Sequence, residues 1–132
     1  MSQESIDLGV AAIEAWNRGD YEGWVHAFAS NCELWPLRAQ LEGNPYRGHA
    51  GLREFMRDVT DDWEGVRFSV EESRDKDDFI VARVRFRGRG RASRADIDVP
   101  IGVVSIVRAG KIVETHMYSD PAEAFAVAGL QP

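Results

Sequence analysis

The sequence has a single cysteine, Cys32, only three histidines, and no run of about 20 apolar residues that could cross a membrane. One cysteine excludes an internal disulfide and favours a reducing compartment. The first residues show neither the basic nor the apolar segment of a secretory signal, so we expect a cytoplasmic protein without a membrane partner. A formal net charge of −6 argues against nucleic acid as the main partner, because phosphate binding favours a basic face.

Known motifs for cofactors and nucleophiles are also missing. The sequence contains no G-x-S-x-G, no P-loop and no dinucleotide-binding fingerprint. The histidines are scattered and lack the spacing of a metal site, so we expect neither a metal nor a cofactor. What remains is an ordinary globular composition, 44% hydrophobic and 29% charged over 132 residues, which suits one domain spanning 1–132.

Periodic apolar residues predict helices first and strands afterwards. Helical spacing predicts segments at 6–16, 20–28 and 49–59, and the short run 32–37 is typical of a strand. From residue 66 the period changes to two, which predicts four strands, at 66–71, 80–87, 97–107 and 112–119. Asp120, Pro121 and Glu123 are typical of the start of a short last helix. Helices followed by consecutive hairpins predict an α+β fold.

Four stretches of the chain match a known family in order and spacing. They are NRGDYEGWVHAFASNCELWP, YRGHAGLREFM, DFIVARVRFRGRGR and GKIVETHMYSDP. Together they resemble the SnoaL-like polyketide cyclases of the nuclear transport factor 2-like superfamily. The resemblance implies a cone-shaped fold, in which a curved antiparallel sheet wraps around three helices and encloses a small-molecule pocket. It also implies a homodimer, and it leaves open both an enzyme and a non-catalytic binding or dimerisation module.

The resemblance also implies which activity is absent. Ketosteroid isomerases of that superfamily use an aspartate base, a tyrosine and a protonated acid, and the matching positions here hold Trp35, Ala12 and Gly102. Without a base for the α-proton or a donor for the enolate, that mechanism lacks its parts. The resemblance places Trp35 on the wall of the pocket, together with Trp16 and Phe55.

His116, Tyr118 and Asp120 alternate on the last predicted strand, so their side chains share one face. If that face is inward, His116 and Asp120 form a catalytic acid–base pair for an apolar polyketide- or terpenoid-like ligand, and Tyr118 donates a hydrogen bond to it. If Thr115 and Met117 face inward instead, His116 and Tyr118 lie on the outer surface and Asp120 is only a helix cap. A slip of one residue exchanges the faces, so both arrangements stay open.

The loop 38–48 contributes two further pocket candidates, Arg38 and Tyr46. In the fold that the resemblance implies, this loop covers the mouth of the pocket. An arginine there can hold a carboxylate or an enolate of the ligand. The alternative is a surface loop whose arginine is solvated.

Arginines alternate along one predicted strand, at Arg83, Arg85, Arg87, Arg89 and Arg91. A basic stripe of this kind can bind phosphate. However, neighbouring strands carry acidic residues that can pair with the stripe, namely Glu71, Asp96 and Asp98. We therefore expect cross-strand ion pairs on an outer face and no nucleic-acid site.

Both sets of alternating residues are apolar in the strand predicted at 97–107. Ile101 and Val103 belong to one set, and Val104 and Ile106 to the other. A strand that is apolar on both faces is covered on both faces. We expect the helices to cover one face and a second copy of the chain to cover the other.

Overall fold

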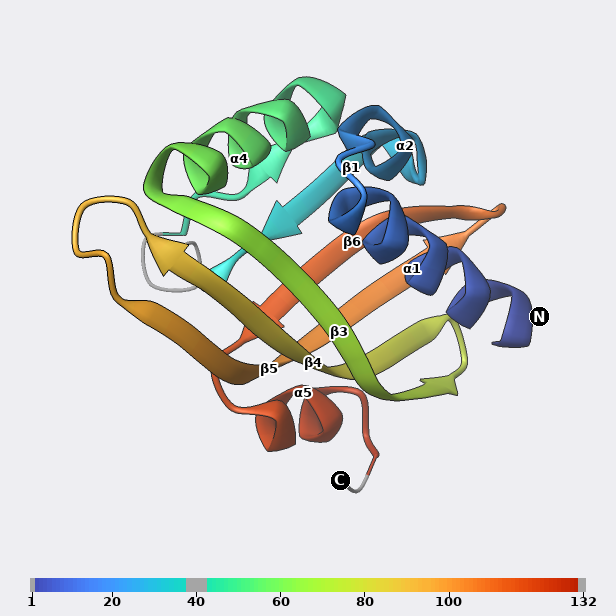
Figure 1. Ribbon diagram of the computed structural model, residues 1–132. Coiled ribbons are helices and arrows are strands. Elements are labelled where there is room, and N and C mark those ends of the chain that lie inside the picture. Colours follow the sequence, from blue (N-terminus) through green and yellow to red (C-terminus); the bar gives the residue numbers. More distant parts are fainter. Residues whose placement is uncertain (1, 38–42, 131–132) are drawn as a thin grey trace.

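The computed structural model, which describes residues 2–37 and 43–130, shows a strongly curved sheet with helices on both sides (Figure 1). Its elements, in chain order, are α1 (Ser2–Asn17), α2 (Tyr21–His26), β1 (Phe28–Trp35), β2 (Tyr46–Arg47), α4 (Gly48–Asp62), β3 (Trp63–Lys76), β4 (Phe79–Gly90), β5 (Asp96–Arg108), β6 (Lys111–Tyr118) and α5 (Pro121–Val127). The predicted α+β class is confirmed. No helix in the described ranges is long and apolar enough to cross a membrane.

The strand order in the sheet is β2-β1-β6-β5-β4-β3. The strands from β3 to β6 pair as antiparallel neighbours, as their hairpin spacing predicts. By contrast, β1 and β6 run parallel, because α4 and four strands, β2 to β5, separate them in the chain before β6 returns beside β1. The sheet is therefore mixed at this one pairing, and β3 forms one end of it.

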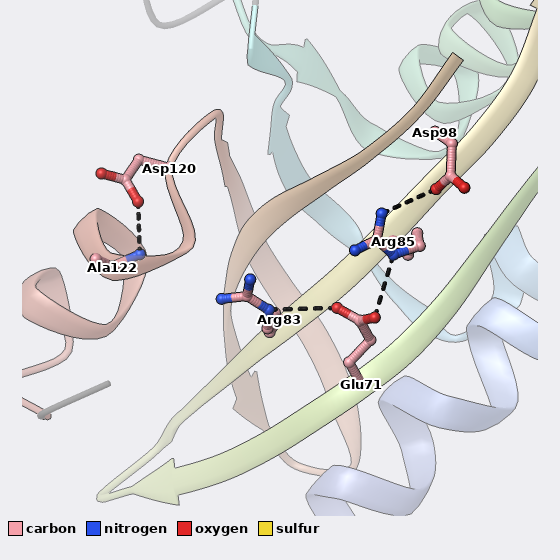
Figure 2. A network of polar contacts seen from close by, with 6 residues as sticks. All are labelled: Glu71, Arg83, Arg85, Asp98, Asp120 and Ala122. Atoms are coloured by element: carbon pink, nitrogen blue, oxygen red, sulfur yellow. Dashed lines mark hydrogen bonds and ion pairs between the residues drawn. The ribbon is translucent and has the colours of Figure 1, made fainter. Parts of the chain in front are cut away.

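Local signals in the sequence explain how the strands and the last helix are joined. The β5–β6 turn consists of Ala109 and Gly110, both with positive φ (52° and 73°), as a tight type I′ hairpin requires. At the start of α5, the side chain of Asp120 accepts a hydrogen bond from the Ala122 N–H at 3.0 Å (Figure 2). Pro121 occupies the first turn of that helix, which confirms the predicted helix start.

The inner face of the sheet packs against α1, α2 and α4 around a cluster of aromatic rings. Trp16 lies at its centre, with ring centroids 4.9 Å from Trp24, 5.1 Å from Tyr21 and 5.7 Å from Phe68. Most of these pairs are edge-to-face, the geometry that the quadrupoles of aromatic rings favour. This cluster fixes α1 and α2 over the concave side of the sheet.

The outer face of the sheet is covered in part by α5 (Figure 1). Phe125 and Ala124 of this helix pack against Val81 of β4 and Val104 of β5. A second copy is therefore not needed over this part of β5, because the chain covers it with its own last helix, and the predicted homodimer stays a prediction. The two apolar faces of β5 therefore carry no information about an oligomer.

The arginine stripe of β4 forms the ion pairs that the sequence predicts. Glu71 accepts from both Arg83 (3.3 Å) and Arg85 (3.2 Å), and Arg85 also donates to Asp98 at 3.0 Å (Figure 2). Further along the strand, Arg89 pairs with Asp96 at 2.8 Å. The arginine holds the pKa of Asp96 below its ordinary value. Acidic residues of β3 and β5 thus neutralise much of the stripe.

Candidate functional site

A cavity of about 100 Å³ lies between α1 and the inner face of the sheet. Side chains from α1, α2, α4 and five strands line it. Most of these side chains are aliphatic or aromatic, and the polar ones are the hydroxyls of Ser73, Ser105 and Thr115. Within residues 2–37 and 43–130, no ionisable side chain lines the cavity. The described part of the site can therefore surround an apolar molecule, and none of its lining side chains exchanges a proton near neutral pH.

Two residues placed on the pocket wall by sequence, Trp16 and Phe55, lie on the wall of this cavity. Trp16 is 3% exposed and Phe55 is 7% exposed, and their ring centroids are 6.0 Å apart. They come from α1 and α4, so the wall forms only when both helices dock on the sheet. Trp24 and Phe68 extend the same aromatic wall.

The polar groups of the cavity are concentrated where β5 meets β6. Ser105 and Thr115 face each other across the two strands, and their hydroxyl oxygens are 2.9 Å apart. Thr115 is only 5% exposed, so this pair lies in an apolar surrounding. One hydroxyl hydrogen is used in the mutual bond, and the other can be donated to a ligand.

Trp35 and His116 lie on the opposite face of the sheet from the cavity, which corrects the inward placement of Trp35 and the inward alternative for His116. The two are register partners on β1 and β6, next to Leu34 and Thr115, which line the cavity. Because side chains alternate along a strand, the neighbours of inward residues point outward. The Trp35 and His116 rings stack there at 5.6 Å with an interplanar angle of 7°.

Charged neighbours hold this stacked pair on the outer face. Trp35 donates its indole N–H to Glu33 at 3.2 Å, and Glu33 also accepts from Arg47 at 3.2 Å. These two hydrogen bonds hold the pKa of Glu33 below its ordinary value, with the Trp35 bond the larger cause. On β6, a ring nitrogen of His116 lies 2.8 Å from a carboxylate oxygen of Glu114. The sheet therefore separates His116 from a ligand in the cavity.

Asp120 and Tyr118 also lie away from the cavity. Asp120 caps α5, because its carboxylate accepts a hydrogen bond from the Ala122 N–H at the start of that helix (Figure 2). Tyr118 is half-buried beside the apolar cluster under α5. Burial, and to a smaller extent the charge of Glu123, raises the pKa of its hydroxyl. Neither side chain is placed to act on a molecule held between α1 and the sheet.

Of the two pocket candidates in the loop 38–48, the structure describes Tyr46 but not Arg38. Tyr46 lies on β2 outside the cavity, where its ring packs 5.4 Å from Phe55 and its hydroxyl donates to Asp58 at 2.5 Å. This arrangement corrects its expected place on the pocket wall, because its hydroxyl is turned toward α4. Arg38 lies outside the described residues.

Sequence reasoning missed Leu34 and Ser105 as cavity residues, and it missed the reason for Gly102. In the segment CELW, Glu33 is charged and therefore faces outward, so Trp35 shares its face while Cys32 and Leu34 turn inward. Gly102 faces α5, where a Cβ atom would lie 2.5 Å from the Cβ of Ala124. The close approach of α5, and not the loss of a catalytic acid, requires glycine there.

Comparison with known families agrees with this fold. The sequence matches the SnoaL-like domain over residues 10–115, which is most of the chain. The chain belongs to the SnoaL-like domain family. The match contains α2, α4, the strands β1 to β5, the second half of α1 and most of β6, and therefore most of the cavity wall. No curated protein sequence matches the chain.

Solved structures share this SnoaL-like fold at low sequence identity. An NTF2-like protein of unknown function from Burkholderia pseudomallei superposes with a TM-score of 0.79 at 19% identity, covering 95% of this chain and 97% of the other. TerC, co-crystallised with polyporic acid, gives 0.79 at 20% identity with the same coverages. A candidate SnoaL-like polyketide cyclase from Jannaschia gives 0.78 at 13% identity, covering 99% and 95%. At these identities the likeness concerns the fold alone.

Proposed function

We propose that this SnoaL-like domain binds a small, apolar, uncharged molecule in the cavity beneath α1 and does not act on it by acid–base chemistry. The observation that carries the proposal is the cavity lining, which is apolar apart from three hydroxyl groups in the described residues. Burying an ion in such a surrounding costs several kcal/mol unless it is paired, so an uncharged ligand is favoured. The predicted catalytic pair, His116 and Asp120, is not part of this proposal, because both side chains lie outside the cavity.

The size of the cavity narrows the class of ligand. An engineered protein cavity of about 150 Å³ binds benzene, whereas sites for drug-sized molecules measure about 300–1,000 Å³. A cavity of about 100 Å³ is smaller than both, so a single ring or a compact branched chain is the largest ligand that it suits. Among polyketide- and terpenoid-like compounds, we therefore propose a one-ring member. TerC, which shares the fold, was co-crystallised with polyporic acid, which supports a ligand-binding function by analogy.

The hydroxyl pair suggests one further feature of the ligand. Ser105 and Thr115 retain a hydrogen to donate, and the surrounding residues are apolar. A ligand with one carbonyl or nitro oxygen on an otherwise apolar body can accept that hydrogen. The aromatic wall of Trp16, Trp24 and Phe55 offers edge and face contacts to a ring.

Nitrobenzene is expected to bind with a dissociation constant of about 0.1–1 mM, given its few atoms. It matches the proposed ligand in size and polarity, and it quenches tryptophan fluorescence, so binding is measured as saturable quenching. Benzoate has a similar shape but carries a charge, and we expect it to bind at least about a hundredfold more weakly. Equal binding of the two compounds would contradict the proposal.

Two double variants show where the quenching arises. Trp16 and Trp24 line the cavity, whereas Trp35 and Trp63 do not. Replacing the first pair with phenylalanine should remove the saturable part of the quenching. Replacing the second pair should leave it in place. The reverse pattern would place nitrobenzene outside the cavity.

We also propose that two copies associate through the outer face near β1 and β6. This part of the face carries the stacked Trp35 and His116 rings, with Glu33, Glu114 and Arg47 around them. A half-buried aromatic centre with a charged rim is typical of protein interfaces. Arg47 and Glu114 also give the face both signs of charge, which a two-fold contact can use for mutual pairing.

Sedimentation equilibrium at micromolar concentration is expected to give twice the chain mass of 14.8 kDa. Changing Trp35 to glutamate should shift the protein to the monomer mass, because it places a second carboxylate beside Glu33 in the contact. A similar change on an exposed apolar residue elsewhere, Val127→Glu in α5, serves as the control and should leave the dimer intact. A monomer mass for the unchanged protein would refute the association.

A cytoplasmic location completes the proposal. Cys32 is the only cysteine of the chain, and it is buried. Burial raises the pKa of its thiol and so disfavours the reactive thiolate. With one cysteine the chain cannot form an internal disulfide, and this favours a reducing compartment.

A further inference from the structure

A surface groove lies between α1 and β3, directly outside the cavity. Its floor contains Val10 and Ile13 from α1 and Phe68 and Val70 from β3, and all four also line the cavity. The same side chains thus form the wall between solvent and the proposed binding site. A ligand that moves past them passes from the groove into the cavity.

Few hydrogen bonds join the free edge of β3 to α1. The strand lies at the end of the sheet, so its outer edge pairs with none of the described strands. Among the described residues of α1, the hydrogen bonds to this edge come from the end of the helix, where Asn17 donates to the Phe68 carbonyl at 2.7 Å and accepts from the Phe68 N–H at 3.0 Å. Earlier in the helix, Ile6, Val10 and Ile13 are half-buried. Next to the hydrogen-bonded Asn17, Ala15 and Trp16 are buried.

A glycine occupies the middle of the helix face that covers the cavity. Gly9 lies between Ile6 and Ile13 on that face, and all three line the cavity. A helix-interior glycine weakens the helix relative to alanine. Here neither a positive φ nor a close approach requires it, because a Cβ atom at this position would meet nothing within 4 Å. The missing side chain leaves free space at the cavity wall.

We propose that the groove between α1 and the free edge of β3 is the way into the cavity, and that Gly9 sets the size of the molecule admitted. This inference rests on the proposed binding function and adds to it a route and a size-determining residue. A side chain at position 9 would occupy the space that a bound ring needs. Side chains over the groove would slow passage without changing the cavity itself.

The first test changes the size of residue 9 and measures saturable quenching by nitrobenzene. Gly9→Leu is expected to weaken binding by at least about tenfold, because the added side chain fills the space that the ring needs. Ala11 lies on the exposed side of the same helix, so Ala11→Leu is the matched control and should bind as the unchanged protein does. Undiminished binding by Gly9→Leu would overturn the proposal.

A second variant, Gly9→Ala, distinguishes a direct loss of binding from a loss caused by poor folding. The added methyl group should raise the midpoint of thermal unfolding by about 2–6 °C, because alanine favours the helix. The same variant should bind nitrobenzene about threefold more weakly, because the methyl group takes up cavity space. A more stable protein that binds less cannot be explained by damage to the fold. A stable variant with unchanged or stronger binding would count against the role of Gly9.

The route is tested by stopped-flow quenching. Glu14 lies one turn after Val10 on α1 and lines the groove but not the cavity, so Glu14→Phe narrows only the groove. Association and dissociation rates should both fall severalfold while the dissociation constant stays the same. Unchanged rates would show that the ligand enters elsewhere. If the unchanged protein shows no saturable quenching at all, the binding function fails, whereas normal binding with insensitive variants refutes only the route and the role of Gly9.

Discussion

Replacing Trp16 with alanine is expected to lower the free energy of unfolding by about 3–5 kcal/mol. The indole lies at the centre of the inner core, with four aromatic partners at centroid distances of 4.9–6.0 Å. Its removal leaves a void beside the existing cavity, and α1 and α2 lose their shared contact. Chemical denaturation monitored by circular dichroism measures the change.

The matched control is Trp35→Ala, which removes the same ring from the outer face. Trp35 is partly exposed, and its ring contact is the stacked His116. We expect a loss of about 0.5–1.5 kcal/mol, the value of one aromatic pair. Equal losses from the two variants would contradict the assignment of Trp16 to the core and Trp35 to the outer face.

Replacing Gly102 with alanine should lower the free energy of unfolding by about 1–3 kcal/mol, although only one methyl group is added. That methyl carbon would lie 2.5 Å from the Cβ of Ala124 and 2.9 Å from the Cα of Pro121. Because the second atom belongs to the backbone, α5 must move away from the sheet as a unit. The movement would also expose Phe125, which is buried beneath this helix.

The same substitution at Gly9 supplies the contrast. A Cβ atom there meets nothing within 4 Å, so Gly9→Ala should stabilise the protein. The two glycine-to-alanine variants are thus expected to change stability in opposite directions. A stabilising effect at Gly102 would show that α5 does not rest on the sheet as described.

Sequence periodicity was sufficient to predict the helices, the five longer strands and the α+β class, but not β2, which lies in the segment predicted as a loop. The helical spacing of Leu52, Phe55 and Val59 and the alternation along β3 and β4 follow directly from which face is buried. The parallel pairing of β1 with β6 was not predictable in this way. It depends on contacts between segments about 80 residues apart, which periodicity does not contain.

The face of the sheet on which each site residue lies was harder to predict than the helices and strands themselves. Placing Trp35 inward rested on the resemblance, although Glu33, two residues before it, already marked that face as outward. The same signal was present at Glu114, which shares its face with His116. A charged residue two positions away on the same strand therefore indicates which side chains point to solvent better than the size of an aromatic ring does.

A crystal of the protein soaked in iodobenzene tests the central claim most directly, because anomalous scattering locates the iodine without assumptions about contacts. The binding proposal predicts an iodine peak inside the cavity, in van der Waals contact with residues such as Trp16, Phe55 and Met117 that line it. A peak found only on the outer face, for example beside Trp35 and His116, or an empty cavity at saturating iodobenzene, would contradict the account.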